Sequence, residues 1–440
     1  MTKSKKRELF SSKVGFILSC VGAAIGLGNI WMFPYKLGEN GGAAFLIPYF
    51  LFVILLGIVG LITEFTFGRQ FKIGSMVSIK KVLKEKNLKG GSIISILPTL
   101  ALTGIFMFYT VVIGWVLKYF YISVTGKITS IDTANYFAQF TSSKSTVFWQ
   151  FLAVLITLLI VSFGVSKGIE KINKIIIPLL FIIFIALIIK SLSLPNSIEG
   201  VKYLLIPDWS YLLKPKTWVM ALGQAFFTVS LTGCCMVLYG SYTDKSFDIP
   251  NSAMNTALFD TLSALLAAFM IIPAVFALGF KPSAGPALLF VTVPSIFQTM
   301  KFGQLLSVLF FLGIIFASIS SSIAMLEGPV EALMNITNWN RKKTAFITAI
   351  AAFVLAIPLA INSSFFNSFT NFITIILSPI GALIVAFIFF YILDPFKTLD
   401  QVNLGANHKL GIWFMKFGKY IFVPTTFVII ILGSIYGGIG

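Results

Sequence analysis

The sequence predicts an all-α integral membrane protein with eleven transmembrane helices. Of its 440 residues, 57% are hydrophobic and 11% are charged, whereas an ordinary soluble domain is roughly 25% charged. Apolar stretches of about 20 residues or more, long enough to cross a bilayer, recur along the whole chain. Two of these stretches are interrupted by glycine and small polar residues. Together these observations leave no length for a large domain outside the membrane.

The predicted helices are apolar runs that end at charged or turn-forming residues. The eleven runs cover residues 14–37, 43–70, 92–125, 147–166, 172–193, 216–242, 252–279, 303–335, 342–361, 368–393 and 411–437. Because their number is odd, we expect the two ends of the chain on opposite sides of the membrane.

Basic residues predict the orientation. With the N-terminus in the cytoplasm, the cytoplasmic loops hold roughly 23 Lys and Arg and the outer loops roughly 8, the asymmetry that the positive-inside rule describes. We therefore expect a cytoplasmic N-terminus and a C-terminus outside. The net charge of +18 lies mostly between apolar runs, so it does not indicate nucleic-acid binding.

The first run has an alternative interpretation, because a basic start followed by an apolar stretch is also typical of a secretory signal peptide. Cleavage near Ala24 would remove the first half of this apolar run and leave the second half, from Ala24 to Pro34, as an incomplete membrane helix. We therefore expect the first helix to be retained.

Cysteine and histidine exclude several functions. Cys20, Cys234 and Cys235 lie inside apolar runs, and the single histidine, His408, lies in a polar loop. This pattern offers no disulfide framework, metal cluster or haem-ligating pair. The spans also contain no Ser-Lys, Asp-Asp or His-metal constellation, so we do not expect an enzyme.

The two interrupted runs indicate where a binding site lies. The first contains Gly22-Ala-Ala-Ile-Gly-Leu-Gly-Asn29 and the sixth contains Thr228-Val-Ser-Leu-Thr-Gly-Cys234. Unwound backbone is tolerated at membrane depth only where protein or a cavity surrounds it, although glycines also serve close helix packing. The two runs open two consecutive five-span blocks, 14–193 and 216–393. Matched broken helices of this kind predict a transporter built from a five-plus-five inverted repeat, with helices 1 and 6 unwound at mid-membrane.

The same residues carry a resemblance to a known family. Arg7-Glu-Leu-Phe10, Gly22 to Tyr35, Glu39 to Pro48, Glu64 to Arg69, Gly223 to Ser230 and Ser320 to Ala324 are similar to the neurotransmitter:sodium symporters. The resemblance extends to about residue 393, with 411–437 as an additional eleventh helix. It implies a single transporter domain over 1–440, of a bacterial eleven-span kind in the inner membrane.

The resemblance implies a site for an amino acid, whose carboxylate and ammonium need partners away from water. Exposed N–H groups of a broken helix suit the carboxylate and exposed carbonyls suit the ammonium. Tyr109 matches the family tyrosine that holds the carboxylate. The implied substrate residues are Ala24, Leu27, Gly28, Ile105, Tyr109, Val112, Phe227, Ser230, Gly233 and Met325.

Two Na⁺ sites are implied as well, each made of hard oxygen ligands. The first would use Ala24, Asn29, Thr228, Asp260 and the substrate carboxylate, which couples ion to substrate. The second would use Gly22, Ile25, Ala317, Ser320 and Ser321. Taken alone, the serines would also suit ordinary hydrogen bonding between helices.

Asp260 predicts independence from chloride. A carboxylate in an apolar span needs a cation, a proton or a polar cavity. Chloride-dependent relatives have a neutral asparagine at this place and a serine where this chain has Ala264. We therefore expect Asp260 to supply the charge that chloride supplies elsewhere.

Two substitutions within the motifs predict a large aromatic substrate, tyrosine first. Gly233 stands where a leucine-transporting relative has phenylalanine, and Met325 stands where that relative has isoleucine. A missing ring would enlarge the pocket, and methionine adapts to flat rings. A branched aliphatic amino acid is the alternative.

The gates differ from the family pattern. Its outer arginine and aspartate are here Met32 and Asn371, so outer closure would rest on Trp31, Tyr109 and Phe227. On the inner side Arg7, Phe10 and Tyr242 match the gate, whereas its acid is here Asn335.

The function that these patterns favour is Na⁺-coupled import of an amino acid by alternating access. A channel would need a continuous pore, whereas the two breaks lie at one depth and predict an occluded site. A sensor built on a transporter scaffold stays open as an alternative. The expected partners are the amino acid, sodium ions and membrane lipid.

Overall fold

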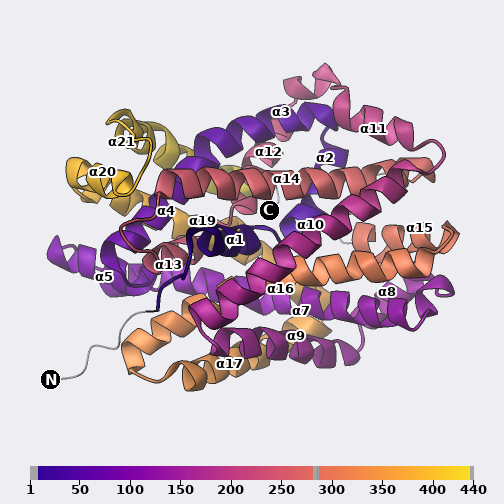
Figure 1. Ribbon diagram of the computed structural model, residues 1–440, viewed down its shortest axis with the longest axis horizontal. Coiled ribbons are helices and arrows are strands. Elements are labelled where there is room, and N and C mark those ends of the chain that lie inside the picture. Colours follow the sequence, from indigo (N-terminus) through magenta and orange to yellow (C-terminus); the bar gives the residue numbers. More distant parts are fainter. Residues whose placement is uncertain (1–7, 281–284, 286, 437–440) are drawn as a thin grey trace.

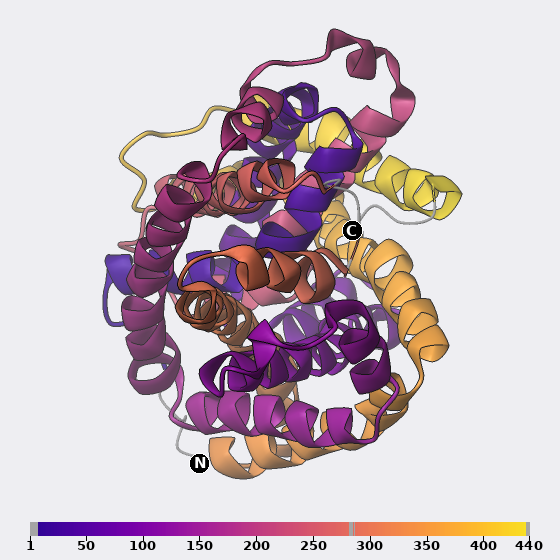
Figure 2. The same ribbon diagram turned by 90° about the vertical axis from the view of Figure 1, so that its right-hand side faces the viewer.

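The protein is a bundle of long helices, as a computed structural model of the chain shows (Figure 1). The structure describes residues 8–280, 285 and 287–436, and this part of the chain contains helices and loops but no strand. Connecting helices gather at the two ends of the bundle, with α5 (Ser75–Glu85) and α20 (Pro395–Asn403) at the left of Figure 1. At the right are α8 (Thr133–Thr141), α11 (Ser197–Leu205) and α15 (Val293–Thr299). Seen along the bundle, α9 and α17 lie at the bottom, as they do in the first view (Figure 2).

Five spans make up the first half. Their elements are α1 (Lys13–Ala24), η1 (Gly28–Met32) and α2 (Phe33–Glu39); α3 (Ala43–Phe52), η2 (Val53–Gly57) and α4 (Ile58–Phe71); α7 (Leu97–Val124); α9 (Ser145–Ser162); and η4 (Val165–Glu170) with α10 (Lys171–Leu192).

In the described residues, the second half contains two shorter helices, α12 (Pro215–Thr228) and α13 (Cys235–Ser241), followed by five spans. The elements of these five spans are α14 (Ile249–Ala277); α16 (Gly303–Thr337); α17 (Arg341–Ile361); α18 (Ser363–Asn371), η7 (Phe372–Leu377), α19 (Ser378–Phe387) and η8 (Ile388–Ile392); and α21 (Trp413–Phe417), η9 (Gly418–Phe422) and α22 (Val423–Tyr436).

Shorter elements connect these spans. They are α5 (Ser75–Glu85), α6 (Gly91–Ile94), η3 (Lys127–Thr129), α8 (Thr133–Thr141), α11 (Ser197–Leu205), η5 (Trp209–Leu213), η6 (Leu288–Thr292), α15 (Val293–Thr299) and α20 (Pro395–Asn403).

The all-helical membrane architecture predicted from the sequence is confirmed. Within the described ranges, nine helices are long and apolar enough to cross a membrane, and α1 with η1–α2 forms a tenth span that bends by 54°. The count of eleven stays a prediction, because it requires α12 and α13 to be two parts of one span.

Helix ends follow local hydrogen bonding. The Ser12 hydroxyl accepts a bond from the Gly15 N–H at 3.0 Å and so begins α1, and the Asp248 carboxylate begins α14 by accepting from the Asn251 N–H at 2.9 Å. Each side chain satisfies an N–H that would otherwise lack a partner in the first helical turn.

The fifth span begins at Val165, seven residues before the predicted start. The predicted helix begins only after a group of charged residues, among them Glu170, whose side chain is 1% exposed. Its carboxylate accepts bonds from the hydroxyls of Ser11 and Ser12 at 2.7 and 2.9 Å and pairs with Lys174 at 2.6 Å. A buried carboxylate with this many partners does not end a helix.

Candidate functional site

The first interruption lies between α1 and η1. Gly26 has no room for a side chain, because a Cβ there would stand 2.5 Å from the Tyr109 hydroxyl and 2.8 Å from the Ser321 hydroxyl. The Gly26 N–H turns to the Asn29 side-chain oxygen at 3.3 Å. Glycine at this position therefore allows α7 and α16 to approach the break closely.

The second interruption separates α12 from α13 and touches the first. Ser230 takes a left-handed conformation with φ +57°, which costs a residue other than glycine roughly 1–2 kcal/mol. Its hydroxyl donates to the Ala23 carbonyl at 3.0 Å, which ties the two breaks together. The Thr232 hydroxyl accepts from the Cys234 and Cys235 N–H groups at 3.3 and 3.2 Å and so starts α13.

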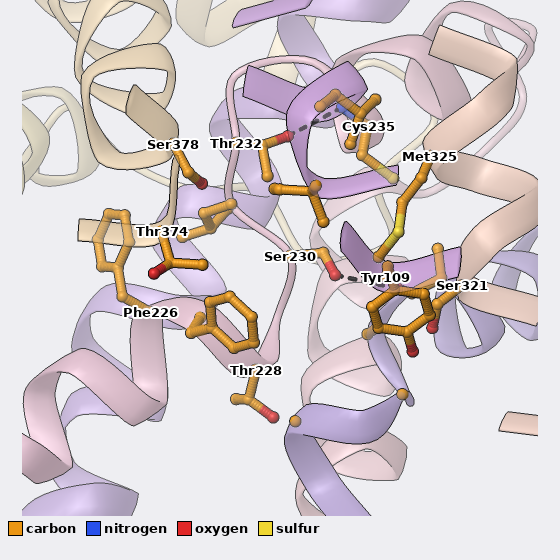
Figure 3. A pocket seen from close by; sticks show the side chains of 18 of the residues that line it. Tyr109, Phe226, Thr228, Ser230, Thr232, Cys235, Ser321, Met325, Thr374 and Ser378 are labelled. Carbon is orange, nitrogen blue, oxygen red and sulfur yellow. Dashed lines mark hydrogen bonds between the residues drawn. The ribbon is translucent and has the colours of Figure 1, made fainter. Parts of the chain in front are cut away.

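A cavity lies between the two breaks. Its volume is about 70 Å³, which leaves room for several water molecules. Figure 3 shows Tyr109, Ser321 and Met325 on one side and Phe226, Thr374 and Ser378 on the other. Eight of the predicted substrate residues line the cavity: Ala24, Leu27, Gly28, Ile105, Tyr109, Phe227, Ser230 and Met325.

One end of the cavity offers hydrogen-bonding groups suited to a carboxylate. The Leu27 N–H donates to the Tyr109 hydroxyl at 3.0 Å, and both residues are buried. The Phe227 ring packs on the backbone of Gly28, where a Cβ would stand 3.1 Å from the ring. These are backbone and hydroxyl groups that can exchange partners when an anion arrives.

Two predicted substrate residues lie elsewhere. Val112 is buried but does not line the cavity. Gly233 faces away from the cavity, because a Cβ on it would overlap the Gly381 carbonyl of α19. Its φ is +70°, its N–H donates to the Glu64 carboxylate at 2.8 Å, and its carbonyl accepts from the Ser75 hydroxyl. Gly233 therefore serves backbone packing in this structure, and its contribution to the pocket wall stays a prediction.

Three residues predicted for one Na⁺ site meet in a buried polar cluster. The Asn29 amide donates to the Asp260 carboxylate at 2.7 Å, and the Thr228 hydroxyl donates to the other carboxylate oxygen at 2.8 Å. Ser263 also accepts from Asn29, at 3.0 Å. The cluster borders the cavity at Asn29 and Thr228.

All five oxygens predicted for the other Na⁺ site converge between α1 and α16. The Ser320 hydroxyl lies 2.7 Å from the carbonyl oxygens of both Gly22 and Ala317. The Ser321 hydroxyl lies 2.8 Å from the Ile25 carbonyl and 3.3 Å from those of Gly22 and Ala317. The end of α1 supplies carbonyls that helical bonding leaves free, which are hard ligands suited to a small cation.

Sequence reasoning missed several residues of the site. Thr374, Ser378 and Ile429 line the cavity, and Ser263 joins the Asp260 cluster. The signal available for Ser263 was its place three residues after Asp260, on the same face of α14. No local signal identifies Ile429, since it is one of many isoleucines in the last span.

An ion-pair network closes the end of the bundle near α13. The buried Glu327 accepts from the Tyr242 hydroxyl at 2.6 Å and from the Arg341 guanidinium at 2.7 and 2.9 Å. Arg341 also pairs with Glu8 at 3.3 Å. Phe10 packs on the rings of Tyr239 and Tyr242 at centroid distances of 5.6 and 6.2 Å.

The remaining predicted gate residues are Arg7, Trp31, Met32 and Asn371, with Asn335 in place of the family's acid. Arg7 lies outside the described residues. Asn335 donates to the backbone of its own helix, at the Glu331 carbonyl, so the acid of this network is Glu327. At the opposite end, Trp31 and Met32 are partly buried and Asn371 is exposed.

The sequence and the fold of this chain are similar to those of known sodium-dependent transporters. A family model described as the sodium:neurotransmitter symporter family matches residues 7–141 and 136–437. The sodium-dependent transporter YhdH of Bacillus subtilis is 33% identical over 98% of both chains. The sodium-dependent serotonin transporter of Drosophila melanogaster is 26% identical over 98% of this chain and 77% of its own length.

A solved structure is similar over the whole fold. The crystal structure of MhsT in complex with L-phenylalanine superposes with a TM-score of 0.87 and is 35% identical, covering 97% of this chain and 100% of MhsT.

Proposed function

The chain belongs to the sodium:neurotransmitter symporter family, and we propose that this sodium-dependent symporter imports an aromatic amino acid, tyrosine first. It is a multi-pass membrane protein and a transporter rather than an enzyme. The proposal extends to alternating access across a bacterial inner membrane, with the N-terminus in the cytoplasm and the two five-span blocks forming an inverted repeat.

The observation that supports coupling to Na⁺ is that oxygen atoms from two helices lie close together. They belong to Gly22, Ile25, Ala317, Ser320 and Ser321. The two hydroxyls of α16 lie within hydrogen-bonding distance of carbonyls from the end of α1 and from α16 itself. A Na⁺ ion there would join α1 to α16, so its binding would favour one arrangement of the two helices.

A second Na⁺ would lie beside the substrate. Asn29, Thr228 and Asp260 supply side-chain oxygens, and Ala24 borders the same cavity. A substrate carboxylate at Leu27 and Tyr109 would complete the ligands. Ion and amino acid would then stabilise each other's binding, which is the thermodynamic requirement for coupling.

The shape of the cavity supports a long side chain. Beyond Ile105 and Met325 it extends to Thr374 and Ser378 of the tenth span and to Ile429 of the eleventh. An aromatic ring would fill the apolar middle, and the hydroxyls at the far side would suit the phenol of tyrosine. The MhsT complex with L-phenylalanine is a similar structure holding an aromatic amino acid.

The carboxylate of Asp260 supports independence from chloride, because it already provides a negative charge next to Asn29 and Thr228. In the Asp260→Asn variant we expect Na⁺-driven uptake to fail without chloride. Unchanged Na⁺ affinity and uptake of this variant in chloride-free buffer would contradict the assignment.

The experiment that tests the function is uptake of labelled tyrosine into proteoliposomes in chloride-free buffer, under an inward Na⁺ gradient against K⁺. We expect accumulation that excess phenylalanine or tryptophan suppresses more than leucine does. Accumulation of another amino acid would keep the symporter and reject the aromatic substrate. Binding without accumulation of any amino acid would favour a sensor.

A further inference from the structure

A second hollow lies on the outside of the bundle, away from the substrate cavity. It is a groove of about 840 Å³ between α19, η8, α22 and the segment from α5 to α7. Apart from Lys89 and Tyr391, every residue that lines it is apolar. Phe387 and Phe427, from its two long walls, are 46% and 55% exposed. In a membrane-spanning protein, such a surface faces lipid.

The groove has the length of one lipid leaflet. Along the tenth span it extends from Ile380 to Ile392, which is roughly 18 Å at the rise of an α-helix. Half of a hydrocarbon core of about 30 Å is roughly 15 Å. One acyl chain of a single leaflet therefore matches the groove.

The polar groups of the groove share one end, because Lys89 follows α5 in the chain and Tyr391 lies just before α20. Both helices lie at the left of Figure 1. Lys89 lines this end, and Tyr391 donates from its hydroxyl to the Lys419 carbonyl at 2.7 Å. The Lys419 ammonium lies 5.1 Å from the centre of the Tyr391 ring.

We propose that an anionic glycerophospholipid binds in this groove, with an acyl chain along α19 and its phosphate at the end that carries Lys89 and Lys419. Apolar walls receive the chain, and ammonium groups beside an interfacial tyrosine attract the phosphate. Lipid binding at this groove involves neither the substrate nor the coupling ion.

Two elements that line the groove, α19 and α5, also contact the backbone of the second helix break. On the cavity side of α19, Gly381 packs against the Thr232 and Gly233 backbone. The Ser75 hydroxyl of α5 donates to the Gly233 carbonyl. A lipid between α5 and α19 would therefore support both contacts of Gly233.

The test is native mass spectrometry of the purified full chain, mixed with equal amounts of palmitoyl-oleoyl phosphatidylglycerol and phosphatidylcholine. We expect one phosphatidylglycerol to be retained in preference to phosphatidylcholine. Lys89→Gln and Lys419→Gln should each weaken its retention about five-fold, the effect of one lysine near an anionic lipid. The control Lys81→Gln changes an exposed lysine on the opposite face of α5 from Leu83, and retention should stay unchanged.

A second pair of variants tests the groove itself. Ile384→Trp fills the groove and should abolish preferential retention, whereas Ile182→Trp, at an exposed position on α10, should not. Equal retention of both lipids by the unchanged chain would overturn the proposal. The proposal would also fail if Lys81→Gln lost as much phosphatidylglycerol as Lys89→Gln, or if Ile384→Trp retained it fully. A dimer that Ile384→Trp dissociates would show instead that the groove is covered by a second copy of the chain.

Discussion

Replacing Gly26 by alanine tests the geometry of the central site. The new Cβ would stand 2.5 Å from the Tyr109 hydroxyl and 2.8 Å from the Ser321 hydroxyl, whereas ordinary contact begins at 3.4 Å. Tyr109 would have to retreat by about 0.9 Å and Ser321 by about 0.6 Å, the differences between these distances. One methyl group would thus disturb the proposed substrate and Na⁺ sites together.

The magnitude follows from the bond at stake. The Tyr109 hydroxyl lies 3.0 Å from the Leu27 nitrogen. If the hydroxyl moved back by about 0.9 Å, it could no longer bind the substrate carboxylate together with the Leu27 N–H. A hydrogen bond to a charged group contributes about 1.5–3 kcal/mol. We therefore expect the KM for the amino acid to rise roughly 10- to 150-fold, and half-maximal uptake to need more Na⁺.

The assay is Na⁺-driven uptake in proteoliposomes, with the thermal stability of the purified variant measured alongside. Gly57→Ala is the matched control, because a Cβ there meets its nearest atom, on Val229, at 3.6 Å. Both kinetic constants of Gly57→Ala should stay within about two-fold of those of the unchanged chain. A Gly26→Ala variant with unchanged constants would refute the role assigned to this close approach.

Three further predictions follow from the structure. Ser321→Ala removes one of five converging oxygens and should raise the Na⁺ concentration for half-maximal uptake about ten-fold. The control Ser318→Ala removes a hydroxyl that donates within its own helix and should leave this concentration unchanged. Equal Na⁺ dependence of uptake in the two variants would contradict the assignment. Arg341→Gln leaves the buried Glu327 without its cation, so the free energy of unfolding should fall by about 3–5 kcal/mol; an unchanged melting temperature would count against the pairing. Gly233→Phe should prevent folding, because its backbone cannot accept a side chain; a folded, leucine-selective variant would place it in the pocket wall.

Local sequence was enough to find most helices, because each span needs its own apolar run. The predicted starts and ends lie within a few residues of the observed ones, for example 43–70 against Ala43–Phe71 for the second span. The largest difference is at the fifth span, where hydrogen bonds from Ser11 and Ser12 and the ion pair with Lys174 stabilise the buried Glu170. Hydropathy alone records the charge of Glu170 and contains no information about its partners.

Family resemblance supplied the residues of the site, but their contacts depend on the fold. The structure brings Ser320 and Ser321 to Gly22 and Ile25 across nearly 300 residues. It turns Gly233 toward Gly381 instead of the cavity. Whether a glycine opens a pocket or admits a neighbouring backbone depends on the direction of its missing Cβ, which no alignment contains.

The sequence by itself determined the class of the protein, its helices and the two places where helices break, since composition, run length and glycine placement are local properties. The tertiary structure decided which oxygens converge, that Arg341 is the cation facing Glu327, and that Ile429 lines the cavity. Each of these joins segments distant in the chain, and their distances are fixed only when the helices pack.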